Sequence, residues 1–268
     1  GEASPPAAPA APAAPAAVPP SLAPSTGGAN PDTEAPAQLL PAAEAAPAWQ
    51  EREVVVETPL QRLTFSTRGG ALVSCQLLEY LRVDGGPVEL LPPRGRGILL
   101  GVRGPGASEL DFSELGFEPS REHLRVGAGE EAVLSFRADA GGGVVLEKTM
   151  RFRGDRYGFG LEVGYRGLQA DTELLVSWLD GVAITEGQAG VDLGEARVVA
   201  LFNGAVEKVQ VDGDDREEVF DDKGLVQWAG ARSKYFLTAV APTAPTERTA
   251  VRLTGAGRGK GELPAYRF

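Results

Sequence analysis

The chain has 268 residues, a net charge of −11 at pH 7 and a single cysteine. Binding to nucleic acid or to an anionic membrane surface needs clustered Lys and Arg, so this acidic balance argues against both classes of partner. One cysteine excludes an internal disulfide, and no run of about eighteen apolar residues predicts a membrane-spanning helix.

Residues 1–49 consist largely of Ala-Ala-Pro units. Recurrent proline blocks helix formation and favours extended polyproline conformations, and this composition offers too little apolar surface for a core. We therefore expect a disordered Ala/Pro-rich linker over 1–49, followed by one folded domain over 50–268. Gly1 in place of an initiator Met indicates a processed or excerpted chain.

The first part of the domain predicts two strands separated by Pro59. Leu63 and Phe65 alternate with polar residues in the second strand, so both side chains are expected in the core. The sequence Arg68-Gly69-Gly70 predicts a tight turn, because glycine adopts positive φ at little cost. Cys75 follows on a third strand, where we expect a buried thiol rather than a lipoprotein acylation site.

The middle of the chain changes from loops to regular strands. Residues 82–128 are rich in Gly and Pro and predict strands at Val88–Leu91 and Ile98–Val102, with long loops elsewhere. Strands are then predicted at Ala132–Ala138, Val144–Arg153, Phe159–Arg166 and Glu173–Trp178, with a turn at Gly154-Asp155. Successive strands without an amphipathic helix predict an antiparallel β-sandwich.

Two stretches near the end have the composition of ligand loops but not their spacing. The acidic residues between Asp212 and Asp222 fail the calcium-loop pattern, because Arg216 and Lys223 occupy ligand positions. The glycines of 255–261 lack the spacing and the Ser or Thr of a phosphate loop. We expect a solvated acidic loop and a flexible turn.

The segment Leu225–Pro242 predicts a strand over Tyr235–Ala241, which Pro242 ends. Both faces of that strand are mostly apolar, with Phe236 on one face and Tyr235 on the other. This pattern is typical of a strand buried inside a sandwich. Trp228, just before the turn at Gly230, is expected to pack in the same core.

Candidate catalytic groups are few. His123 has no second His or Cys near it in the sequence, and no nucleophile motif occurs, so we assign no catalytic, cofactor-binding or metal-binding residue. Trp178 and Trp228 are of the type that stacks on sugar rings, although core packing is the expected use. A carbohydrate-binding, lectin-like module therefore stays open as an alternative function.

Three stretches resemble the large periplasmic domain of the YidC family of bacterial membrane protein insertases. The first is the Thr67–Gly70 turn with Tyr80; the second joins Lys148-Thr149 to Gly154-Asp155 and Tyr157; the third runs from Trp228 through Lys234-Tyr235-Phe236 to Pro242. The family-motif residues, which we expect to be structural, are Arg68, Gly69, Gly70, Gly154, Asp155, Trp228, Tyr235, Phe236 and Pro242.

The resemblance extends over about residues 52–268 and implies an all-β fold, a large twisted antiparallel supersandwich like that of galactose mutarotase. It also implies a place on the periplasmic face of the bacterial inner membrane, with transmembrane helices outside this chain and further strands after residue 268. The implied role is non-catalytic docking or spacing during insertion. The implied partners are the Sec translocon with its accessory subunits and nascent inner-membrane proteins.

Overall fold

The computed structural model describes residues 49–104, 108–185, 193–211, 216–259 and 262–268. Strands dominate these ranges, and among them no helix is long and apolar enough to cross a membrane. The predicted linker over 1–49 lies outside the described residues except for Trp49.

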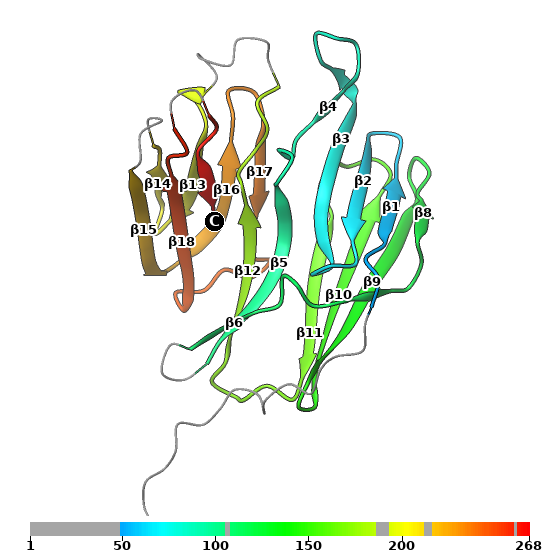
Figure 1. Cartoon of the computed structure of the whole chain (residues 1–268), viewed down its shortest axis with the longest axis vertical. Helices are drawn as coiled ribbons and strands as arrows, with labels where there is room; N and C mark the ends of the chain where they lie inside the picture. Colours follow the sequence, from blue (N-terminus) through cyan, green and yellow to red (C-terminus); the bar gives the residue numbers. More distant parts are fainter. Residues whose placement is uncertain (1–48, 105–107, 186–192, 212–215, 260–261) are drawn as a thin grey trace, which may run out of the picture. The chain divides into compact units, whose positions relative to one another are not determined.

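One long sheet of eleven strands organises the domain (Figure 1). Its main path runs β15-β18-β19-β12-β5-β3-β2-β1-β8, and β4 and β6 pair with β3 and β5. The bounds are β1 (Glu53–Glu57), β2 (Gln61–Ser66), β3 (Ala71–Leu81), β4 (Pro87–Glu89), β5 (Arg96–Arg103), β6 (Glu109–Asp111), β8 (His123–Arg125), β12 (Glu173–Leu179), β15 (Glu217–Gly224), β18 (Thr249–Ala256) and β19 (Ala265–Arg267).

Two four-stranded antiparallel sheets pack against this long sheet. The first has the order β11-β10-β9-β7 and the second β14-β13-β16-β17. Their bounds are β7 (Glu118–Pro119), β9 (Glu131–Gly141), β10 (Val144–Arg153), β11 (Gly160–Arg166), β13 (Arg197–Phe202), β14 (Ala205–Val209), β16 (Val226–Arg232) and β17 (Leu237–Val240). The predicted all-β sandwich is confirmed, with its strands antiparallel apart from the β1–β8 pair.

Aromatic rings join the sheets in both halves of the core. Phe65 of β2 is fully buried, and its ring centroid lies 6.0 Å from that of Phe136 and 6.2 Å from that of Phe152 on the first small sheet. In the other half, Phe202 of β13 meets Phe220 of β15 edge-on at 5.5 Å. The predicted burial of Leu63, Phe65 and Cys75 is thus confirmed.

The structure corrects the prediction of long loops in two regions. Residues 82–128 also form the short strands β6, β7 and β8, and Glu217–Asp222 belongs to β15 rather than to a solvated loop. An edge strand tolerates consecutive charges because one side of it faces water, so an acidic run does not exclude a strand. Asp212 and Asp214, the first and third positions of the calcium-loop pattern, lie outside the described residues.

A strand lies within 235–241, but its predicted position in the core is wrong. The strand there, β17, is four residues long and lies at the edge of its sheet, and Tyr235 and Leu237 are 59% and 50% exposed. A Ser233–Phe236 turn, closed by the Ser233 amide donating to the Phe236 carbonyl at 2.9 Å, brings these side chains to the surface. A buried strand and a strand that presents apolar side chains to solvent show the same alternation of residues, so the sequence pattern cannot distinguish them.

Candidate interaction surface

The Arg68-Gly69-Gly70 turn begins β3 and adopts the predicted backbone conformation, with φ of 68° at Gly69 and 52° at Gly70. A Cβ atom on Gly69 would lie 2.5 Å from the carbonyl oxygen of Ser113. Glycine is therefore needed for both its conformation and its close packing.

Lys148 of β10 holds this turn from the opposite sheet. Its side chain is fully buried, and Nζ donates to the carbonyl oxygens of Gly69 at 2.6 Å, Gly70 at 3.1 Å and Ile98 at 2.6 Å. Nζ also lies 5.1 Å from the ring centroid of Phe117. Ile98 has φ of 52°, which is costly for a β-branched residue, so three left-handed residues direct their carbonyls at one amine.

This contact lies where β3 meets β5 and so joins two parts of the long sheet, the strands β8-β1-β2-β3 and the strands β5-β12-β19-β18-β15. The register between β3 and β5 consists of one residue pair, Leu72 with Gly97, directly beside the carbonyls that Lys148 binds. Burial, with a smaller effect of Arg96, lowers the pKa of Lys148 to about 7, while three acceptors match the three N–H groups of the ammonium form. The geometry assigns Lys148 a structural role.

Three further motif residues meet in an aromatic cluster, Tyr80-Tyr157-Phe236. The Tyr80 ring lies 6.2 Å from that of Tyr157 and meets that of Phe236 edge-on at 5.6 Å. The Tyr157 hydroxyl donates to Glu79 at 2.8 Å, and partial burial together with Glu79 raises the pKa of Tyr157 to about 12. Each ring comes from a different one of the three sequence motifs.

The turn before Tyr157 is held locally. The Gly154 amide donates to the Glu130 carbonyl at 3.0 Å, and a Cβ atom there would clash with the backbone of Gly127. Asp155 accepts from the Arg153 guanidinium, and this hydrogen bond lowers the pKa of the carboxyl group. These contacts fix the β10–β11 connection that places Tyr157 in the cluster.

Around this cluster lies an exposed apolar surface, which we call the apical surface. Figure 1 shows the β3–β4 hairpin and the β16–β17 turn at one end of the domain, the upper end in that view. Sequence reasoning missed this surface, although consecutive apolar residues before a Gly-Gly turn were its available signal. Its residues are Leu78, Tyr80, Leu81, Val83, Tyr235 and Leu237, which are 42–87% exposed.

The tryptophans lie elsewhere. Trp178 is buried, its Nε1 donates to the Gly181 carbonyl at 2.8 Å, and its ring stacks on that of Phe268. A ring in this setting has no free face for a sugar. Trp228 is half-buried on β16, and Pro242 is half-buried just after β17.

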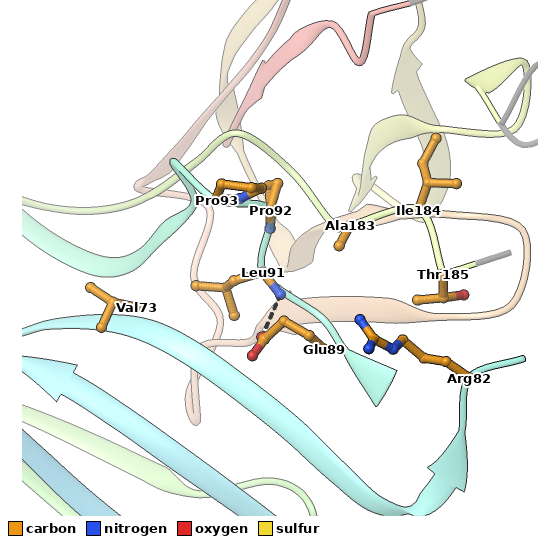
Figure 2. Close-up of a pocket in the computed structure, with 9 residues that line it drawn as sticks. All are labelled: Val73, Arg82, Glu89, Leu91, Pro92, Pro93, Ala183, Ile184 and Thr185. Atoms are coloured by element: carbon orange, nitrogen blue, oxygen red, sulfur yellow. Dashed lines mark hydrogen bonds between the residues drawn. The ribbon is translucent and has the colours of Figure 1, made fainter. Parts of the chain in front are cut away.

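A pocket of about 370 Å³ lies beneath the β3–β4 hairpin. Figure 2 shows Glu89 and Arg82 on its hairpin side, facing the segment Ala183–Thr185. The Glu89 carboxylate accepts hydrogen bonds from the Ser74 hydroxyl and from the amides of Cys75 and Leu91. All three donors belong to the chain around it. This arrangement fixes the position of the loop that follows β4.

The remaining reactive side chains are dispersed. No group of three or more His, Cys, Asp or Glu residues that could hold a metal ion occurs within the described ranges. His123 is exposed on β8. Burial raises the pKa of the Cys75 thiol to about 12, which leaves it in its unreactive protonated form.

Comparison with known proteins identifies the family. The family model for the YidC periplasmic domain matches residues 53–265. A membrane protein insertase YidC from Chlorobium phaeovibrioides is 29% identical, covering 73% of this chain and 35% of that protein. The insertases from Chlorobium limicola (27% identical, 87% and 41% covered) and Geobacter sulfurreducens (30%, 69% and 35%) are similar relatives.

The chain thus spans 35–41% of the length of these relatives. A solved structure of a galactose mutarotase related enzyme from Lactobacillus acidophilus is 9% identical, covers 81% of this chain and 84% of that chain, and gives a TM-score of 0.45. That likeness is too distant to inform function. The family model, in contrast, covers most of the folded residues, and the chain belongs to the YidC periplasmic domain family.

Proposed function

We propose that this chain is the periplasmic domain of a membrane protein insertase and supports insertion as a non-catalytic docking or spacing module. The observation that carries the proposal is the family match over residues 53–265, together with relatives named as insertases. The domain would act on the periplasmic face of the bacterial inner membrane. Its partners would be the Sec translocon with its accessory subunits and nascent inner-membrane proteins.

The side chains support a docking role over a catalytic one. Lys148 is held by three carbonyls, the Glu89 carboxylate accepts from three donors, and His123 is exposed on β8. Catalysis needs a convergent set of groups around a reacting atom, and these groups do not converge. The apical surface, in contrast, presents apolar side chains to the outside, as interaction sites do.

The test is to delete residues 53–265 from the full-length parent protein and to measure insertion of a small membrane protein. We expect insertion to be largely preserved, because a docking module lies outside the insertion path. The point variant Phe65→Ala in the full-length parent is the control for misfolding of the domain in place.

Insertion that disappears on deletion, while the shortened protein stays folded and in the membrane, would contradict the accessory role. Cross-linking from a photoreactive residue at Tyr235 to a translocon subunit would support docking. Cross-linking from the distant position Val206 at the same yield would count against a defined docking face, because Val206 is 63% exposed on β14.

A further inference from the structure

We propose that the apical surface contacts the lipid bilayer directly, with the β3–β4 hairpin tip entering the headgroup region. The inference rests on the proposed function for the presence of a membrane nearby. Of the ten large apolar residues that are exposed in the described ranges, six belong to this one surface. Single exposed apolar residues are ordinary, but a cluster of them indicates an interaction site.

The hairpin has the shape of a projecting tip. β2 pairs with β3 only as far as Leu77, so the rest of β3 extends beyond its neighbour. Exposure rises along this extension, from 42% at Leu78 to 67% at Leu81 and 87% at Val83. A convex tip buries its aliphatic side chains most completely in a fluid apolar medium that surrounds it. The acyl boundary of a bilayer provides such a medium.

The rings lie behind the tip, where an interfacial position suits them. Tyr80 and Tyr235 are 47% and 59% exposed, and Nζ of Lys234 lies 4.8 Å from the ring centroid of Tyr235. Tyrosine and lysine each combine an apolar body with a polar end, so they favour the layer between headgroups and acyl chains. The tip thus carries Leu81 and Val83 together with the paired charges of Arg82 and Asp84, and the two tyrosines lie behind it at the depth that interfacial aromatic residues favour.

The local charge also fits an anionic bilayer. The three segments that build the aromatic cluster, 78–87, 153–157 and 232–237, contain five basic residues against three acidic ones, and Glu195, which pairs with Arg232 at 3.3 Å, brings the local balance to five against four. At the tip itself Arg82 is paired with Asp84 at 2.7 Å, which leaves Leu81 and Val83 beside a neutral pair. Exposed charges more than about 8 Å apart are screened at physiological salt, so this local balance outweighs the net charge of −11.

The proposal departs from the expectation, drawn from the whole-chain charge, that argued against an anionic membrane surface as a partner. The acidic residues concentrate elsewhere, as on β15, where Glu217, Glu218, Asp221 and Asp222 face solvent. A surface that combines apolar contact with a local excess of cations is the type that binds anionic lipid interfaces.

The experiment places a polarity-sensitive dye on Val83→Cys in the full chain. Cys75 is buried with a protonated thiol, so labelling is selective for the new cysteine. The chain is anchored through an N-terminal His-tag to vesicles with nickel-chelating lipids, which raises the local concentration of a weak contact. We expect a blue shift and quenching by lipids with spin labels in their acyl chains, both stronger with one-third phosphatidylglycerol than with phosphatidylcholine alone.

The matched control is Val206→Cys, because Val206 is also exposed but lies on β14 and outside the apical surface. It should show neither effect. Without the anchor, Leu81→Ser/Val83→Ser should reduce co-flotation with anionic vesicles by at least about tenfold. The exposed pair Val206→Ser/Val219→Ser, 63% and 54% exposed and outside the apical surface, should leave it unchanged.

An unshifted dye at Val83→Cys on both vesicle types would overturn the proposal. A shift that appears only after a translocon subunit or an apolar peptide is added would assign the surface to a protein partner and would also overturn it. Neither result bears on the deletion experiment above, so failure of the lipid contact and failure of the docking role remain distinguishable.

Discussion

Lys148 stabilises the place where β3 meets β5 in the long sheet. Replacing it with Met removes all three donors to the carbonyls of Gly69, Gly70 and Ile98, and buried acceptors without partners are costly. We expect Lys148→Met to lower the free energy of unfolding by about 2–4 kcal/mol at pH 7, measured by urea denaturation. Lys208→Met, at an exposed lysine of β14, should change it by less than about 0.5 kcal/mol.

The lowered pKa of the same residue predicts how stability changes with pH. Its pKa is about 7 in the folded state against 10.5 in the unfolded state, so between these values the unfolded chain binds more protons. Stability from this group therefore rises as pH increases from about 7 towards 10.5. The difference between wild type and Lys148→Met should widen from pH 7 to pH 9, and a difference that narrows would contradict the lowered pKa.

Among the elements, β2 and the turn before β17 show what the sequence pattern leaves undetermined. Phe65 and Phe236 both stand in apolar alternation, yet Phe65 is fully buried and Phe236 is half-buried at the apical surface. Phe65→Ala should therefore cost about 3–5 kcal/mol of stability, but Phe236→Ala or Trp228→Ala only about 1–2 kcal/mol. Chemical denaturation of the three variants measures this, and equal costs would mean that the apical surface is covered in the native protein.

The sequence predicts strands and turns correctly wherever neighbouring residues alone decide the backbone conformation. The Gly69-Gly70 turn has the positive φ that glycine adopts at little cost, and the strands on either side of it occur where alternation predicts them. Pairing partners were not predictable, because β3 meets β5 through a long connection and the motif rings come together only through tertiary packing. The aromatic cluster is therefore visible in the structure and hidden in the sequence.

For the whole molecule, composition alone separates the folding part from the rest of the chain. Apolar alternation begins at about Glu53, and the described core is built from residues after Trp49, with Val54 and Val56 as its first fully buried members. The family match begins at the same place, at residue 53. The role of the Ala/Pro-rich segment as a linker stays a prediction, since it lies outside the described residues.

Removing residues 1–48 tests that prediction. If the segment is a spacer that buries no surface, the truncated chain should keep both the melting temperature and the slope of unfolding free energy against urea. The slope scales with the surface that unfolding exposes, and a solvated spacer exposes none. A truncated chain with a smaller slope and a lower melting temperature would show instead that part of residues 1–48 packs on the sandwich, and the domain boundary would then move towards the N-terminus.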